Sequence, residues 1–169
     1  MRPAVFSPRF YWIWIFCASA CASSASFDGG IYRYKNVHFS ISPPSHWNRI
    51  ELTQQAIAFR DAAGHASYLT QGRCGQKSDD VPLSALTQQL LMGTTERSYI
   101  VEEEVEIDRR SALHTRLSAK LDGVPMLYSL YVVKKDGCMY DFVCIAPPHL
   151  NACGEGFDAF VRTFHALQP

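Results

Sequence analysis

The chain has 169 residues, and 16 basic side chains balance 16 acidic ones, so its formal net charge is zero. No basic run or stripe occurs along it, which argues against a protein that binds nucleic acid. The length is sufficient for one domain with a substantial core.

The first 25 residues follow the order of a secretory signal peptide. Met1–Arg9 carries two positive charges and no acid, Phe10–Phe16 is wholly apolar, and Cys17–Ala25 contains only small residues. A transmembrane helix would need about 20 apolar residues, so this short run indicates cleavage rather than anchoring. We expect residues 1–20 to be removed and the remaining 149 residues, with 14 basic and 16 acidic side chains, to be exported to the periplasmic face of a bacterial membrane.

The cleavage region has two interpretations. Ala18–Ala20 suits ordinary signal peptidase, and the same residues followed by Cys21 resemble a bacterial lipobox, although the usual Leu three positions before the cysteine is missing. Lipidation of Cys21 would leave four other cysteines in the exported chain, an even set for pairing. We therefore predict a lipid anchor at Cys21, a flexible tether over residues 21–29 and a single domain over residues 30–169. The alternative is that Cys21 is one more small residue of the signal.

Strand-like segments dominate the first half of the domain. Val37–Ser42 and Trp47–Leu52 flank a Pro43-Pro44 break, and Ala56–Arg60 and Ala66–Gly72 flank a turn, which predicts a hairpin. The leucines of Leu83–Leu91 then recur at helical spacing, between Pro82 and Gly93.

An acidic alternation follows the predicted helix. Glu102, Glu104, Glu106 and Asp108 alternate with other residues, and the next strand, Leu113–Leu121, carries basic side chains on one of its faces. We expect the acidic and basic faces to pair across a solvated surface, rather than to form a ligand site.

Two Asp-Gly turns, Asp122-Gly123 and Asp136-Gly137, are strong hairpin signals. The neighbouring strands, Met126–Val133 and Cys138–Ala146, are apolar on both faces, so both faces need cover. The Leu83–Leu91 helix and a final Phe157–Phe164 helix are the candidates for that cover. The sequence thus predicts an α+β fold, in which an antiparallel meander β-sheet is covered by helices on both faces as a three-layer α/β/α sandwich.

The four cysteines that remain besides Cys21 can pair in three ways. Cys138 and Cys144 lie on one predicted strand, about 20 Å apart, so they cannot bond to each other. Two schemes remain, and we favour Cys74–Cys138 with Cys144–Cys153, because the second bridge then closes a short loop.

The sequence contains no recognisable catalytic or metal-binding motif, so we predict neither a metal nor a cofactor. Its histidines lack metal-ligand spacing and are expected at surfaces and turns: His38, His46, His65, His114, His149 and His165. Asp141 is the one carboxylate within an apolar strand, and a structural hydrogen-bonding role is favoured for it over acid–base catalysis.

The order of these segments resembles the PsbP-like superfamily, specifically its small bacterial lipoproteins. The resemblance spans roughly Tyr32 to Phe164 and rests on Val37–Pro44 with Trp47, the Leu83–Leu91 helix, Leu121–Pro125, Lys134–Val143, Ala146–Pro148 and the closing helix. It implies an antiparallel sheet between helices and non-enzymatic work, as a subunit or assembly factor that docks on larger complexes. No metal-ligand set of the family can be matched here.

Three functions therefore compete. The first is a lipid-anchored, non-enzymatic domain that docks on an envelope complex through a protein partner. The second is a periplasmic carrier of a small ligand, with Trp47, Tyr128, Tyr131 and Tyr140 lining a pocket. The third is a hydrolase that uses Asp141.

Overall fold

The computed structural model of the chain describes residues 25–52, 55–61, 63, 65–75, 80–150 and 152–167. The predicted signal peptide and Cys21 lie outside these residues. The strands are β1 (Ser26–Asp28), β2 (Ile31–Tyr34), β3 (Val37–Ser40), β4 (Trp47–Ile50), β5 (Ala56–Asp61), β6 (Ala66–Cys74), β7 (Thr94–Ile107), β8 (Arg110–Leu121), β9 (Val124–Lys135), β10 (Cys138–Ala146) and β11 (His165–Leu167). The helices are α1 (Leu83–Leu90) and α2 (Glu155–Arg162). Strand β1 falls within residues 21–29, the range assigned above to the tether.

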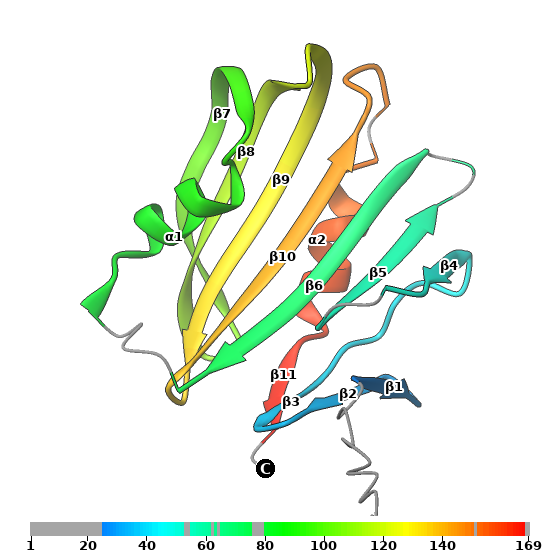
Figure 1. Cartoon of the computed structure of the whole chain (residues 1–169), viewed down its shortest axis with the longest axis vertical. Helices are drawn as coiled ribbons and strands as arrows, with labels where there is room; N and C mark the ends of the chain where they lie inside the picture. The colour runs from blue at the N-terminus through cyan, green and yellow to red at the C-terminus, as the bar shows by residue number, and fades with distance from the viewer. Residues whose placement is uncertain are drawn as a thin grey trace, which may run out of the picture.

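Seven strands form one antiparallel sheet in the order β4-β5-β6-β10-β9-β8-β7 (Figure 1). The two Asp-Gly turns connect β8 to β9 and β9 to β10, as the sequence predicts. Asp122 and Gly123 have φ of 49° and 82°, and Asp136 and Gly137 have φ of 53° and 71°. Positive φ at both central residues is the requirement of a type I′ hairpin turn, which explains why this dipeptide is a reliable signal.

A second, four-stranded antiparallel sheet has the order β1-β2-β3-β11. Its last strand comes from the end of the described chain, and Ala166 of β11 lies opposite Phe39 of β3. The sequence predicts a strand at β3 but not the separate sheet. The small sheet packs on the same face of the large sheet as α2, because both contribute side chains to one apolar cluster.

The predicted three-layer α/β/α sandwich is wrong. The chain is mostly β, and the two helices of the described residues have eight residues each, so each is about 12 Å long. Seven strands about 4.8 Å apart span about 29 Å, which such helices cannot cover. Helix α1 covers part of one face through Leu86, which packs with Val132 and Met139. On the other face the small sheet supplies cover that the sequence analysis assigned to a helix.

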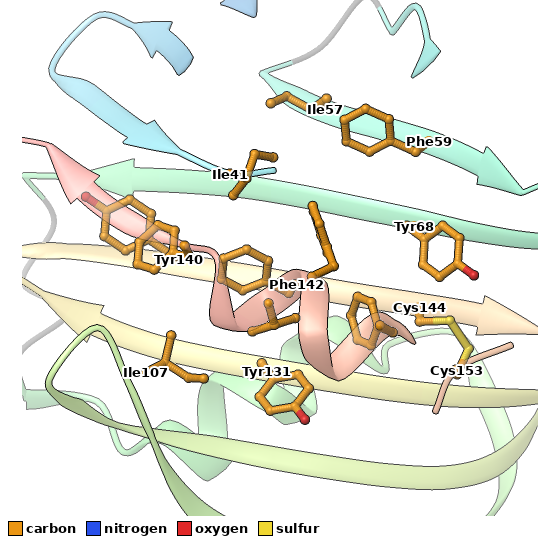
Figure 2. Close-up of a cluster of buried hydrophobic side chains, with 14 of the residues drawn as sticks. Ile41, Ile57, Phe59, Tyr68, Ile107, Tyr131, Tyr140, Phe142, Cys144 and Cys153 are labelled. Carbon is orange, nitrogen blue, oxygen red and sulfur yellow. A yellow bond between two sulfur atoms is a disulfide. The ribbon is translucent and has the colours of Figure 1, made fainter. Parts of the chain in front are cut away.

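The main core lies between the large sheet, the small sheet and α2 (Figure 2). Tyr140 and Phe142 of β10 contact Phe164, at ring-centroid distances of 4.8 and 5.2 Å. Trp47 of β4 stacks on Tyr68 of β6 with ring centroids 3.5 Å apart. The aromatic residues of this core therefore hold the second sheet and the last helix against the first sheet.

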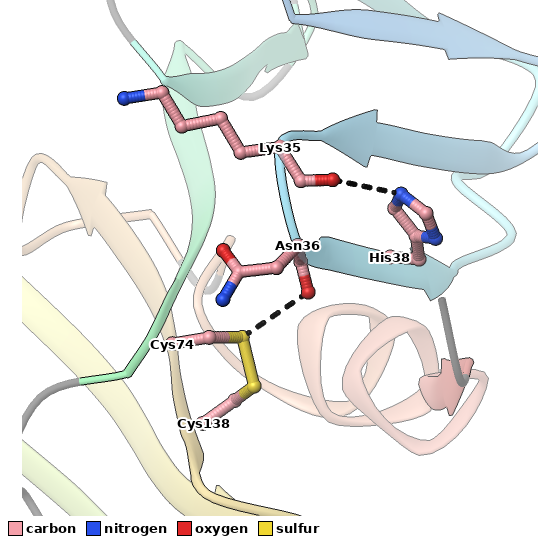
Figure 3. Close-up of a disulfide and its surroundings, with 5 residues drawn as sticks. All are labelled: Lys35, Asn36, His38, Cys74 and Cys138. Carbon is pink, nitrogen blue, oxygen red and sulfur yellow. Dashed lines mark hydrogen bonds between the residues drawn. A yellow bond between two sulfur atoms is a disulfide. The ribbon is translucent and has the colours of Figure 1, made fainter.

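The structure contains the disulfide pairing that the sequence analysis favours, Cys74–Cys138 and Cys144–Cys153. Cys74 and Cys138 lie directly opposite each other on β6 and β10, where the sheet departs from sequential strand order. The sulfur of Cys74 is 3.5 Å from the carbonyl oxygen of Asn36, in the turn between β2 and β3 (Figure 3). This bridge thus lies where the small sheet approaches the large one.

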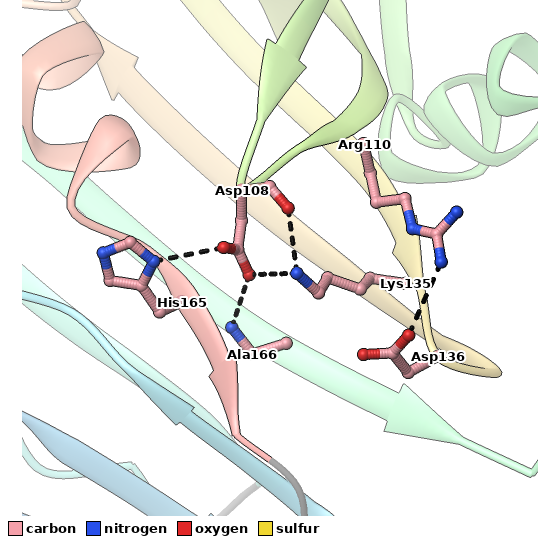
Figure 4. A network of polar contacts seen from close by, with 6 residues as sticks. All are labelled: Asp108, Arg110, Lys135, Asp136, His165 and Ala166. Atoms are coloured by element: carbon pink, nitrogen blue, oxygen red, sulfur yellow. Dashed lines mark hydrogen bonds and ion pairs between the residues drawn. The ribbon is translucent and has the colours of Figure 1, made fainter.

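Asp108 links the large sheet to the C-terminal strand β11 (Figure 4). Its carboxylate lies 2.7 Å from Nζ of Lys135, accepts a hydrogen bond of 2.9 Å from the amide of Ala166, and lies 3.1 Å from Nδ1 of His165. Both Asp108 and Lys135 are almost inaccessible to solvent. The ion pair therefore positions the small sheet rather than lying on a solvated face.

Candidate functional site

Asp141 is buried on β10, as its apolar surroundings in the sequence suggest. One carboxylate oxygen accepts hydrogen bonds from Arg73 at 2.7 Å and from Gln71 at 3.0 Å, both on β6. Burial raises the pKa of this carboxyl above its usual value, although the Arg73 charge and both hydrogen bonds act in the opposite direction. The contacts of Asp141 connect two neighbouring strands, which is a structural role.

A second polar cluster surrounds His114, which is buried within a strand and not at a surface or turn as predicted. His114 of β8 lies with Nε2 3.1 Å from the hydroxyl of Ser129 on β9, and with Nδ1 3.3 Å from the carboxylate of Glu103 on β7. Its ring stacks on Tyr131 with centroids 4.2 Å apart. The three residues are brought together by the strand register, since Glu103 lies opposite His114.

The order serine, histidine, carboxylate is that of a nucleophilic triad, but Ser129 has no access to substrate. Its exposed fraction is 0%, and it lies in the middle of β9, opposite Cys144. A nucleophile must reach a substrate atom within about 3 Å of its oxygen. In the observed conformation the cluster therefore connects three strands through hydrogen bonds and does not form an active site.

The other residues considered as candidates do not form a common binding site. The four aromatic residues proposed to line a pocket, Trp47, Tyr128, Tyr131 and Tyr140, are buried. In the described ranges, no group of three or more His, Cys, Asp or Glu side chains is placed to hold a metal ion. Neither α1 nor α2, the helices of the described chain, is long and apolar enough to cross a membrane.

A groove of about 760 Å³ lies between β1 and β2 of the small sheet and the β4–β6 side of the large sheet. Its polar side chains bond mainly to groups of the groove itself. Arg49 donates a hydrogen bond of 3.0 Å to the carbonyl of Phe27 and lies over the Phe27 ring, and Gln55 donates one of 2.9 Å to the hydroxyl of Tyr34. The volume suits a small ligand.

Exposed large apolar side chains occur at several positions along the other edge of the large sheet. We define the apolar corner as Met92, Tyr99, Ile100, Leu121 and Val124, of which Met92, Ile100 and Val124 are 75%, 59% and 57% exposed. Met92 precedes β7, and Tyr99 and Ile100 lie on β7. Leu121 and Val124 lie at the turn between β8 and β9, where Leu121 is opposite Thr94 at the start of β7. Exposed apolar side chains at one edge of a sheet provide a surface on which a partner can pack.

Three glutamates of β7, Glu102, Glu104 and Glu106, do not pair with the basic residues of β8 as predicted. Glu102, Glu104 and Glu106 lie opposite Thr115, Leu113 and Ser111, respectively. The turn after β7 sets this register and places the expected basic partners on the opposite face. Among the described residues, none of the three carboxylates has an ion pair, and Glu104 accepts a hydrogen bond of 2.9 Å from the Ser111 hydroxyl.

No family model and no curated protein matches this sequence. Solved structures do match it. Cyanobacterial PsbP (CyanoP) from Synechocystis sp. PCC 6803 superposes with a TM-score of 0.57 at 12% identity, over 89% of this chain and 97% of that protein. The fold is PsbP-like. The family resemblance inferred from the sequence is thereby confirmed at the level of the fold.

Two further solved structures match this chain. LpqN of Mycobacterium tuberculosis, described as involved in cell envelope biogenesis, matches with a TM-score of 0.50 at 11% identity, over 78% of this chain and 83% of that protein. A protein of Bacteroides thetaiotaomicron matches with a TM-score of 0.57 at 15% identity, over 77% of this chain. The match spans only 45% of the Bacteroides protein. At these identities the likeness concerns the fold.

Proposed function

We propose that the protein is an exported, non-enzymatic domain that is anchored through Cys21 and docks on a larger assembly of the cell envelope. The apolar corner carries this proposal, because Met92, Ile100 and Val124 are large apolar side chains that are more than half exposed. The two disulfides fit an oxidising compartment outside the cytoplasm. The PsbP-like fold and the envelope role stated for LpqN are in keeping with it.

The arrangement of the two sheets supports docking at a distance from the membrane. Only four residues separate Cys21 from the start of β1, so Ser26 would lie within about 18 Å of a lipidated Cys21. Strand β1 contacts β4 through Arg49, at one edge of the large sheet. The apolar corner lies at the β7 edge, six strand spacings or about 29 Å away. In an anchored domain, the apolar corner would thus lie at the edge of the large sheet that is far from the anchor and would be accessible to a partner.

The experiment is native gel electrophoresis of membranes from the native host, solubilised in a mild detergent. We expect the wild-type chain to migrate within a large complex, and Ile100→Lys or Val124→Lys to release it. Leu52→Lys is the matched control, since Leu52 is 42% exposed and follows β4 at the opposite edge. Complexes that persist in both corner variants would contradict docking through this surface.

The groove favours a second candidate, a carrier of a small ligand, because its volume of about 760 Å³ lies in the range of ligand sites. Mass spectrometry of organic extracts from the purified protein tests it. A carrier would yield a bound compound in stoichiometric amount, which Tyr34→Ala should reduce.

A further inference from the structure

The outer edge of β7 is a second surface that the fold leaves unpaired. Strand β7 is the last strand of the large sheet, and its described neighbour is β8 on one side only. An edge strand presents backbone N–H and C=O groups that can pair with a further strand. The register with β8 is interrupted between Thr95 and Ser98 and again between Tyr99 and Val101, but runs regularly from Val101 to Ile107. That regular stretch of seven residues is long enough to receive a strand.

The regular stretch is strongly acidic. Glu102, Glu104 and Glu106 are exposed and, at alternate positions, lie on one face, while Glu103 on the other face reaches His114. No Lys or Arg of the described chain forms an ion pair with these four carboxylates. In the described chain, this edge therefore combines backbone groups that no strand pairs with and three glutamates that form no ion pair, Glu102, Glu104 and Glu106.

This charge pattern determines which kind of strand can pair with the edge of β7. A second copy of β7 would place glutamates beside glutamates, and like charges directly opposite each other destabilise a strand pair. An extended segment with Lys or Arg at alternate positions would instead place cations beside Glu102, Glu104 and Glu106. Tyr99 and Ile100 of the apolar corner immediately precede the stretch, so both surfaces could contact one partner.

We propose that Val101–Ile107 binds a basic, extended segment of a partner protein, which adds to the large sheet as an eighth strand. Backbone hydrogen bonds would supply the pairing and the glutamates the selectivity, as in other cases of β-strand addition. The inference rests on the proposed docking function and specifies the chemistry of the partner.

The test uses the purified exported protein and a fluorescent synthetic peptide of alternating Lys and Thr, with a Glu–Thr peptide as the control. We expect the Lys–Thr peptide to bind, its affinity to fall with added salt, and amide hydrogen exchange to slow over residues 101–107. Glu104→Lys should weaken binding by about tenfold. Glu96→Lys is the matched control with the same change in charge, because Glu96 lies on β7 before the regular stretch and already pairs with Lys120.

Three results would overturn the inference: no binding of the Lys–Thr peptide, equal losses in Glu104→Lys and Glu96→Lys, or binding without slower exchange in β7. Thermal unfolding of each variant confirms that the exposed substitutions leave the fold intact. If the peptide fails while Ile100→Lys still releases the native complex, docking stands and the basic segment is excluded. If the complex resists the corner variants, docking through the corner fails whatever the peptide does.

Discussion

Asp108 and Asp141 are nearly inaccessible carboxylates whose surroundings move their pKa values in opposite directions. Burial raises the pKa of Asp108, but hydrogen bonds from Lys135, the Ala166 amide and His165 outweigh it, so the net pKa lies below the usual value. For Asp141, burial outweighs the charge of Arg73 and the hydrogen bonds, and the pKa is raised. The two residues should therefore contribute to stability at opposite ends of the acidic pH range.

Asp108→Asn is expected to destabilise the protein by about 1–3 kcal/mol near neutral pH, because it leaves the Lys135 ammonium without its anionic partner. Asn tolerates the positive φ of 48° at this position, so the turn itself should persist. Since the folded pKa is depressed, the contribution of Asp108 is complete above the unfolded pKa of about 3.9 and is lost as pH falls through the folded pKa. Urea unfolding at about pH 6 and about pH 3 should show a smaller difference from wild type at the lower pH. An equal difference at both pH values would contradict a contribution of the Asp108–Lys135 ion pair to stability.

Asp141→Asn should show the reverse trend. A raised folded pKa means that the contribution of Asp141 is greatest below the unfolded pKa and is lost as pH rises through the folded one. Asn can still accept a hydrogen bond from Gln71, and Arg73 is partly solvated, so the cost near neutral pH should be about 1 kcal/mol or less. The same unfolding series measures it. A stability difference that grows with pH would show that the carboxylate is favoured as the anion.

The sequence indicates which residues are buried better than it indicates their partners. Asp141 is recognisable as a carboxylate in an apolar strand, but Arg73 and Gln71 come from β6, which reaches β10 only through a non-sequential pairing. The contact of His114 with Ser129 and Glu103 depends in the same way on the register of three strands. Asp108 belongs to an acidic alternation in the sequence, and only the path of β11 shows that it is enclosed.

The strands joined by local turns were predictable, and the long-range arrangement was not. The Asp-Gly turns specify β8, β9 and β10 through a backbone conformation that the dipeptide itself favours. The second sheet pairs strands from opposite ends of the chain, β3 with β11, so no local pattern defines it. The apolar residues on both faces of β9 correctly predict that both faces of the sheet are covered. They do not specify whether a helix or a second sheet covers each face.

The two disulfides should differ in their sensitivity to reductant. Cys144 and Cys153 are fully buried, whereas Cys74 and Cys138 are partly exposed, so a mild reductant should open Cys74–Cys138 first. The bridges span 64 and 9 positions, which in the chain-entropy model corresponds to about 4 and about 3 kcal/mol. Alkylation followed by peptide mass mapping over time would measure the order. Earlier labelling of Cys144 and Cys153 in the folded protein would contradict the observed burial.

At the scale of the whole molecule, Cys21→Ala is expected to move the protein from the membrane to the soluble periplasmic fraction while leaving the folded domain unchanged. Stable attachment requires at least two lipid chains, so loss of the modified residue should abolish it. Cell fractionation with an unfolding curve of the released protein measures both effects. Wild-type protein that is already soluble, with an unmodified amino terminus, would contradict the anchor and leave export in place.

The central claim is that an exported domain docks through the β7 edge, away from its anchor. Ile100 and Leu52 are both exposed apolar residues, at opposite edges of the large sheet, and thus form a matched pair. A photo-crosslinking amino acid placed at each position in the native host tests the claim most directly. We expect one discrete protein adduct from position 100 and none from position 52. Adducts of equal yield from both positions, or none from position 100, would contradict it.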